Sequence, residues 1–120
     1  MSTEPLGCER DSVGRSPALM VRLSRRVAIP YPILAVAPMV GQCDLPFREL
    51  TRRKSASLVY SEMLSAEKFA ASARYRIDAF GSDATGAIGD SGPLLVQFCT
   101  RSPAAFAAAA KEAARLGAAG

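Results

Sequence analysis

The sequence contains no histidine among its 120 residues. This absence excludes, within this chain, a Ser-His-Asp or Cys-His catalytic set, because both need an imidazole as general base. It also excludes the His-Glu-x-x-His helix of metalloproteases and any zinc site with histidine ligands. No metal is therefore expected.

Cysteine is scarce as well. The residues Cys8, Cys43 and Cys99 lie far apart and form no Cys-x-x-Cys pair. An odd number of widely spaced cysteines makes no disulfide framework, so the sequence predicts a reducing compartment. We expect the cytoplasm, with the nucleus and the organelles left open.

Long apolar runs and strong charge are also missing. No run approaches the about 20 apolar residues of a membrane-spanning helix, so no membrane association is expected. Apolar residues make up 49% of the chain, which is normal for a globular protein. The formal net charge of +4 permits an anionic partner such as RNA and equally serves plain solubility.

Residues 1–30 differ from the rest of the chain. They are rich in arginine, serine and proline and show no sustained apolar period. Their arginines suit an organelle transit peptide, but Glu4, Glu9 and Asp11 argue against one, because such peptides are poor in acids. We expect a disordered or irregular lead over 1–30 and the folded part over 31–120.

The folded part contains three apolar runs with strand character. Residues 33–38 are continuously apolar, which is typical of a strand buried on both faces. Residues 57–63 are rich in valine, leucine and tyrosine and predict a second strand. Residues 93–98 predict a third, which begins at a proline as a strand can.

Each predicted strand is followed by an amphipathic or alanine-rich stretch with a residue suited to cap a helix. The three expected N-caps are Asp44, Ser65 and Ser102. The first helix has Phe47 and Leu50 as an apolar stripe at i, i+3. The second runs over 66–77, and the third over 103–116 with Gly117 just past its end.

The alternation of strands and helices implies parallel strands and an α/β fold. An open doubly wound sheet of the Rossmann type predicts a Gly-x-Gly-x-x-Gly turn after the first strand, and residues 37–47 do not supply it. The glycine-rich stretch 81–92 follows a helix and precedes a strand, so it predicts a flexible connector and no phosphate loop. A TIM (β/α)8 barrel is favoured.

A barrel needs about 250 residues, and this chain has room for its first three βα units. The last predicted helix ends at the sequence RLGAAG, where a fourth strand should begin. We therefore expect the N-terminal part of a larger enzyme.

Three blocks of the sequence, in this order, resemble the N-terminal part of the tRNA-dihydrouridine synthases. They are APMVGQCDLPFREL (37–50), LVYSEMLSAEKF (58–69) and PLLVQFCTRSPAAFAAAAKEAARLGAAG (93–120). The resemblance covers residues 33–120. The dipeptide Tyr75-Arg76 and the sequence VQFC (96–99) look most like the eukaryotic branch of the family. It implies a flavoenzyme with a (β/α)8 catalytic domain.

The resemblance implies FMN as cofactor and four residues that contact it. In the family, the turn that matches Ala37, Pro38 and Met39 lies against the isoalloxazine ring, and Gln97 matches a glutamine that contacts FMN. Proline stiffens such a turn, and methionine offers a polarisable side chain to an aromatic ring. Without the resemblance, Met39 would be an ordinary rim residue. Gln97 lies in an apolar run and is expected to be buried and hydrogen-bonded, to the flavin or alternatively to neighbouring loop backbone.

Other polar residues are candidates for the substrate side. Glu62 and Ser61 are expected to end the second strand and face the mouth of the barrel, where Glu62 touches the substrate base or holds a basic residue. The family's proton donor is a cysteine in a Gly-Cys-Pro motif after the fourth strand, which the resemblance places beyond Gly120. Cys43 and Cys99 lie in no such motif, and Cys99 is expected to pack at the rim.

The resemblance implies reduction of selected uridines in tRNA, with NAD(P)H as reductant. Basic residues are then expected to contact RNA, and the candidates are Arg48, Arg52, Arg53 and Lys54, which a solvated helix face explains equally well. Two alternatives stay open: an FMN barrel that oxidises or reduces a small molecule, and a non-catalytic relic half-domain. The oligomeric state stays open as well.

Overall fold

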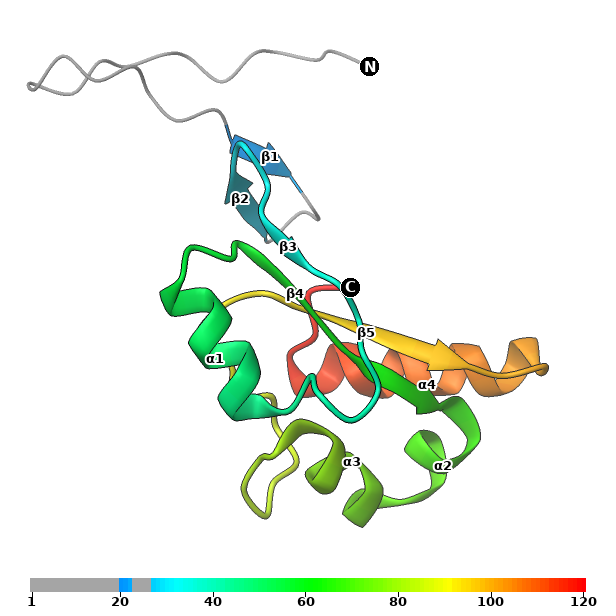
Figure 1. Cartoon of the computed structure of the whole chain (residues 1–120). Helices are drawn as coiled ribbons and strands as arrows, with labels where there is room; N and C mark the ends of the chain where they lie inside the picture. Colours follow the sequence, from blue (N-terminus) through cyan, green and yellow to red (C-terminus); the bar gives the residue numbers. More distant parts are fainter. Residues whose placement is uncertain (1–19, 23–26) are drawn as a thin grey trace, which may run out of the picture.

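The computed structural model describes residues 20–22 and 27–120. Most of the expected irregular lead, residues 1–19 and 23–26, lies outside the described residues. Within the lead, β1 (Met20–Arg22) and β2 (Ala28–Pro30) pair as an antiparallel ribbon. The sequence did not predict this ribbon, which Figure 1 shows at the end of the molecule away from the helices α2 and α3.

A parallel sheet of three strands forms the centre of the fold, in the order β3-β4-β5. Its strands are β3 (Ala35–Val36), β4 (Leu58–Ser65) and β5 (Leu94–Cys99). Both strand pairs are parallel, with Ala35 opposite Leu58 and Val59 opposite Leu94. The predicted α/β class with parallel strands is confirmed, and β4 separates β3 from β5.

The first strand is shorter and more exposed than predicted. The expected strand over 33–38 is reduced to Ala35–Val36, and the side chains of Ile33 and Leu34 are 36% and 52% exposed. A strand is buried on both faces only where other layers of structure cover both faces of the sheet and a neighbouring strand lies along each of its edges. Among the described residues, β3 has only β4 as a strand neighbour, so Ala35 and the preceding apolar residues are exposed, whereas Val36 packs against the core.

Helices follow the strands with the predicted caps. The first, α1 (Leu45–Arg53), has Asp44 as N-cap, and α4 (Pro103–Leu116) has Ser102 as N-cap and Gly117 in the left-handed region at its end. These local signals were sufficient because each cap satisfies a free N–H group within its own turn.

The second helix was predicted as one piece but is two. Ser65 caps α2 (Ala66–Ala71), as expected, and Ser72 then interrupts the helix with an extended backbone. The Ser72 hydroxyl accepts a hydrogen bond from the backbone N–H of Tyr75 at 3.2 Å and so caps α3 (Ala73–Phe80). A serine that can cap a new helix competes with continuation of the old one.

The core lies between the sheet and the helices α2, α3 and α4. Its largest residues are Phe69, Phe80 and Leu94, all fully or almost fully buried. Phe69 contacts Phe80 edge to face, with ring centroids 5.5 Å apart, and contacts Phe98 at 4.9 Å. Figure 1 shows α4 alongside β5 and α2 next to the tip of β4. The helices therefore cover one face of β4 and β5.

The helix α1 does not bury the stripe that its sequence suggested. Leu50 is 54% exposed, Phe47 is partly buried, and the fully buried residue of this helix is Arg48. A cation can occupy this position because a carboxylate meets it, as described below. None of the helices in the described part of the chain is both long and apolar enough to cross a bilayer.

Candidate functional site

The turn after β3 is built around the thiol of Cys43. The backbone N–H of Met39 lies 3.2 Å from Cys43 Sγ, and the thiol is 3.5 Å from the carbonyl oxygen of Ala37. Ala37 and Pro38 are exposed, whereas Met39 is partly buried. The turn therefore lies at the surface at the carboxyl end of β3, as predicted, and its backbone is held by the buried thiol of Cys43.

Gln97 lies on the face of the sheet that the described helices leave open. It is opposite Met63 in the register of β4 and β5, and Met63 is 50% exposed. The side chain of Gln97 is exposed, so the prediction of a buried amide was wrong. Burial was expected because Gln97 lies in an apolar run. Its neighbours Val96 and Phe98 pack against the core beneath the helices, and Gln97 points to the other face of the sheet because side chains alternate along a strand. None of the described residues hydrogen-bonds its side-chain amide.

A bulge in β4 separates Ser61 from the mouth. The register shifts between Tyr60 and Met63, where β4 has one residue more than β5. Ser61 is fully buried there, and its hydroxyl accepts from the Gln97 N–H at 3.0 Å and donates to the Glu62 carbonyl at 2.7 Å. Ser61 therefore supports the backbone of Gln97, and the prediction that it faces the mouth was wrong.

The bulge directs Glu62 into a separate hollow. This hollow of about 280 Å³ lies beside the N-terminus of α1. It is lined by Glu62, Asp44, Asp78 and Tyr75, among others, and includes neither Gln97 nor the Ala37–Met39 turn. Glu62 also does not end its strand, since β4 continues to Ser65. Glu62 is therefore the only predicted site residue in the lining, although Met63, the register partner of Gln97, lines the hollow as well.

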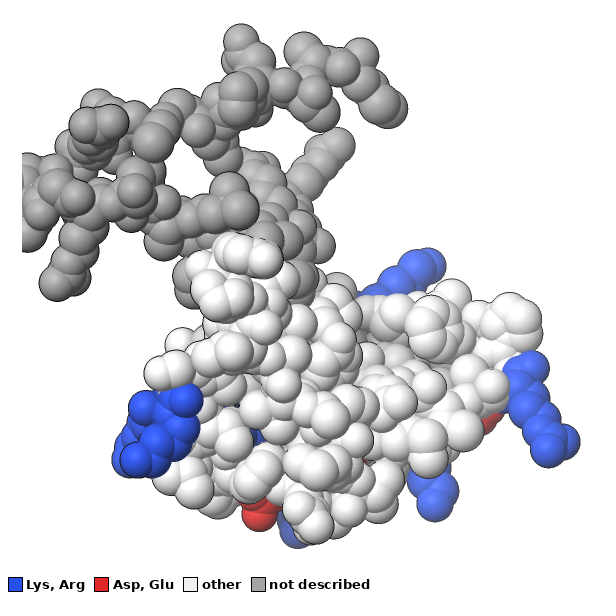
Figure 2. Space-filling model, turned by 45° about the horizontal axis from the view of Figure 1, so that its top comes forward, with Lys and Arg blue, Asp and Glu red and all other residues white. Residues whose placement is uncertain are grey.

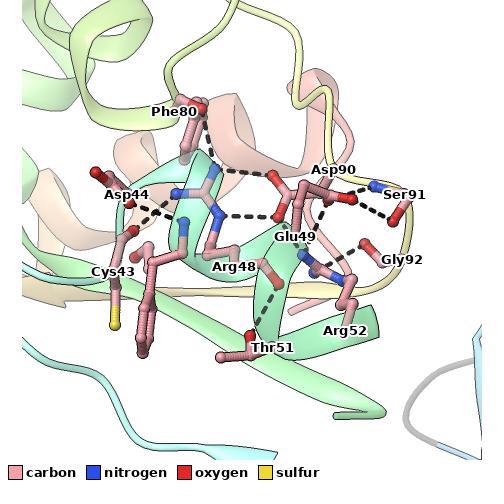
Figure 3. Close-up of polar contacts among 12 residues, drawn as sticks. Cys43, Asp44, Arg48, Glu49, Thr51, Arg52, Phe80, Asp90, Ser91 and Gly92 are labelled. Atoms are coloured by element: carbon pink, nitrogen blue, oxygen red, sulfur yellow. Dashed lines mark hydrogen bonds and ion pairs between the residues drawn. The ribbon is translucent and has the colours of Figure 1, made fainter. Parts of the chain in front are cut away.

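An ion-pair network lies beneath the turn. The guanidinium of Arg48 contacts both carboxylate oxygens of Asp90, at 2.8 and 2.9 Å, and the side chains of both residues are 0% exposed. Arg48 also donates to the carbonyl oxygens of Cys43 at 2.8 Å and Phe80 at 2.9 Å. Figure 3 shows Arg48 in the middle of these contacts. One side chain therefore joins the turn after β3, the end of α3 and the segment before β5.

The same network holds the glycine-rich segment 81–92 in place. Arg52 contacts Asp90 at 2.6 Å and donates to the carbonyl oxygens of Gly92 and Pro93. The carboxylate of Glu49 accepts from the N–H and the hydroxyl of Ser91, at 2.9 and 2.6 Å. The prediction of a flexible connector was therefore wrong at its C-terminal end, because a buried ion pair and backbone contacts anchor it.

The network changes which basic residues can reach RNA. Arg48 and Arg52 were candidates, but Arg48 is fully buried, the side chain of Arg52 is 9% exposed, and both are occupied by Asp90. Arg53 and Lys54 remain exposed at the end of α1. Figure 2 shows the lysines and arginines scattered over the visible face, with uncharged residues between them.

Cys99 is also exposed, and it does not pack at the rim as predicted. It lies opposite Ser65 in the sheet register, on the same open face as Gln97. Within the described residues, no group of three or more potential ligands is placed to hold a metal ion.

Glu49 makes this part of the fold sensitive to acid. The hydroxyl of Ser91, and next its backbone N–H, hold the pKa of Glu49 below its ordinary value of 4.5. The ionised carboxylate of Glu49 therefore stabilises the folded state fully above its ordinary pKa of 4.5. This stabilisation is lost as the pH falls through the lower pKa that Glu49 has in the folded state. We expect Glu49→Gln to reduce the loss of unfolding free energy between about pH 6 and about pH 3.5, measured by urea unfolding. An unchanged pH dependence in the variant would contradict this.

The sequence reasoning missed the Arg48–Asp90 pair and the role of the Cys43 thiol. The only local signal was the spacing of Arg48 and Arg52, which places both on one face of α1. Their partner lies 42 residues away in the chain from Arg48, and no pattern in the glycine-rich segment distinguishes Asp90 from an exposed aspartate. Long-range pairing of this kind needs the tertiary structure.

Comparison with known proteins gives a consistent result. The sequence profile of the family described as "Dihydrouridine synthase (Dus)" matches residues 35–120. A tRNA-dihydrouridine(16/17) synthase of Saccharomyces cerevisiae, whose name also specifies NAD(P)(+), is 45% identical over 97 residues, which are 78% of this chain and 22% of the relative. The protein of the same name from Schizosaccharomyces pombe is 43% identical over 79 residues, covering 66% of this chain and 19% of the relative.

A rat protein with the same name and the suffix "-like" is 43% identical over 75 residues, covering 62% of this chain and 16% of the relative. The chain thus spans about a fifth of the length of these relatives. No solved structure matches it at a significant level.

Proposed function

Because the chain belongs to the dihydrouridine synthase family, we propose that it forms part of an enzyme that reduces uridine in tRNA to dihydrouridine. The observation that carries this proposal is the match over 35–120, which coincides with three parallel βα units. In such folds the chemistry is placed at the carboxyl ends of the strands. The turn after β3 lies at this edge, and Gln97 lies in the C-terminal half of β5.

We infer that the three units belong to a closed (β/α)8 barrel. Two hydrogen bonds support this: the Ala119 N–H donates to the Leu94 carbonyl at 2.9 Å, and the Val96 N–H donates to the Gly120 carbonyl at 2.8 Å. The last residues of the chain thus contact the edge of β5 that β4 does not occupy. A fourth strand would follow the same edge, and the exposed apolar residues around β3 suit the strand that closes a barrel.

The open face of the sheet fits FMN as the cofactor. Gln97 presents a free amide with a donor and an acceptor, which suits the mixed hydrogen-bonding edge of a flavin ring. Ala37, Pro38 and Met39 would supply the rigid surface next to the ring. When bound, FMN supplies the hydride chemistry, with NAD(P)H as the proposed source of electrons. The residues of this chain position the ring and exclude water from one side of it.

The proton that completes the reduction would come from a residue outside this chain. Cys43 is 1% exposed, and its thiol already contacts Met39 and Ala37, so it cannot reach a substrate. Cys99 is exposed but lies in no Gly-Cys-Pro motif. Glu62 would face the base or a basic residue through its hollow, while Arg53 and Lys54 are the basic candidates for tRNA contact on α1. For its location we propose the cytoplasm, which suits cysteines that form no disulfide framework, with the nucleus and the organelles left open.

We expect Gln97→Ala to weaken FMN binding by the full-length protein by about 1–3 kcal/mol, because the flavin would lose a hydrogen-bonding partner. Flavin fluorescence quenching measures the dissociation constant. Cys99→Ala is the matched control, since Cys99 lies two residues away on the same face of β5, and it should leave the constant within about twofold. Equal affinities for the wild type and Gln97→Ala would remove Gln97 from the site.

The activity itself is tested with the full-length protein, unmodified tRNA and NADPH, by measuring dihydrouridine in the digested RNA. The same assay with free uridine and with dihydroorotate as substrates distinguishes a tRNA enzyme from a flavin enzyme of small molecules. Flavin binding without reduction of tRNA would contradict the proposal. The 120-residue chain alone is expected to be inactive and to hold FMN weakly, because it has three parallel βα units and spans about a fifth of the length of its relatives.

A further inference from the structure

We propose that Cys43, Arg48 and Asp90 are positioning residues for the Ala37–Met39 turn. This inference rests on the proposed function, since the turn matters for the reaction only if a flavin lies against it. None of the three residues is placed to touch the flavin. Their effect would pass through the backbone of the turn.

The thiol of Cys43 is the first link. It accepts the N–H of Met39 at 3.2 Å and lies 3.5 Å from the carbonyl oxygen of Ala37, so it contacts both sides of Pro38. The Cys43 N–H also donates to the Met39 carbonyl at 3.2 Å. With its N–H directed at sulfur, Met39 offers a ligand its side chain and no free backbone donor.

Arg48 is the second link. It holds the carbonyl oxygen of Cys43 at 2.8 Å from a site with no solvent exposure, so the turn is fixed from its C-terminal side. Thiol hydrogen bonds are weak, and a thiol by itself would not hold a surface turn. The carbonyl group of Cys43 is held by the Arg48 guanidinium, and its side chain is held by contacts with Met39 and Ala37. Together these contacts leave Cys43 one orientation.

Asp90 is the third link, because it sets the plane of the Arg48 guanidinium. A bidentate contact between arginine and carboxylate has a defined geometry, which a single contact lacks. Asp90 contacts Nε and one terminal nitrogen, and the other terminal nitrogen then points to Cys43. The segment before β5 is thereby coupled to the turn after β3, although β4 separates the two strands.

The test uses the full-length protein and two readouts. Amide hydrogen exchange at Met39 reports the turn itself, and the dissociation constant of FMN reports its consequence. The variants are Cys43→Ala, which removes the thiol, and Cys43→Ser, which restores a donor and an acceptor. Cys99→Ala controls for the loss of a thiol elsewhere, and unchanged far-UV circular dichroism controls for the fold.

We expect Cys43→Ala to raise the exchange rate of the Met39 amide by about tenfold and to weaken FMN binding by about fivefold. Cys43→Ser should return both values to within about twofold of the wild type, and Cys99→Ala should change neither. Arg48→Lys keeps the charge but loses the fork of donors, and it should raise the Met39 exchange rate as well. If Arg48→Lys does not fold, the comparison of Cys43→Ala with Cys43→Ser still decides the test.

An unchanged Met39 exchange rate in Cys43→Ala would overturn the inference, even if the protein binds FMN and reduces tRNA. An altered exchange rate with unchanged FMN affinity would also overturn it, because the contacts would then be structural only. A wild-type protein that binds no FMN would overturn the proposed function first, and this result is separate because the exchange measurement needs no flavin.

Discussion

Asp90→Ala is expected to lower the unfolding free energy by about 3–5 kcal/mol, because it leaves the buried guanidinium of Arg48 without a counter-ion. Arg48 is 0% exposed, and Asp90 is its only carboxylate partner among the described residues. Arg48→Ala should cost less, since Asp90 would keep its contact with Arg52 at 2.6 Å. The order of the two variants therefore follows from the geometry.

The measurement is urea unfolding of the full-length protein followed by circular dichroism. Asp83→Ala is the control within the same glycine-rich segment, because Asp83 is exposed and its carboxylate accepts hydrogen bonds only from the nearby Thr85 among the described residues. Its cost should stay within about 1 kcal/mol. The double variant Arg48→Ala, Asp90→Ala should cost less than the sum of the single variants. A cost for Asp90→Ala as small as that for Asp83→Ala would contradict the view that the ion pair holds this segment.

Phe69→Ala is expected to lower the unfolding free energy by about 3–5 kcal/mol, since it removes a fully buried ring and leaves a cavity. Phe69 lies on α2, and its ring meets Phe80 of α3 and Phe98 of β5. No other aromatic ring in the described part of the chain makes both contacts. Its loss would weaken the packing of both short helices against the sheet, and helices of this length depend on such packing because they are marginal in isolation.

Phe106→Ala is the matched control. Phe106 also meets Phe98 edge to face, with centroids 6.2 Å apart, but it is 50% exposed. Its replacement should cost about 1 kcal/mol or less, because little apolar surface leaves the interior. Phe69→Leu should lie between the two, since it keeps much of the buried volume. Similar costs for Phe69→Ala and Phe106→Ala would show that the core is not centred on α2.

The order of strands and helices could be predicted from the sequence because its signals are local. Asp44, Ser65 and Ser102 each cap a helix through a backbone N–H three residues further along the chain. Gly117 ends α4 in a conformation that glycine adopts without a steric cost. Such contacts need no distant partner, so the residues that make them are visible in the sequence.

The sites were only partly predictable. The family and the placement of the Ala37–Met39 turn at the end of β3 followed from motifs in the sequence. The exposure of Gln97 and the separation of Glu62 from the turn did not, because both depend on which face of the sheet the helices cover. The bulge in β4 adds to this, since one extra residue changes the direction in which the following side chains point.

The sequence alone determined the α/β class, the parallel order of the strands, most helix caps and the family, since each depends on neighbours in the chain or on a motif. Only the tertiary structure decided that Arg48 is buried, that Asp90 anchors the glycine-rich segment and that Cys43 supports the turn. The physical reason is the cost of burying a charge. A guanidinium leaves water only where a carboxylate meets it, and here that carboxylate lies 42 residues further along the chain.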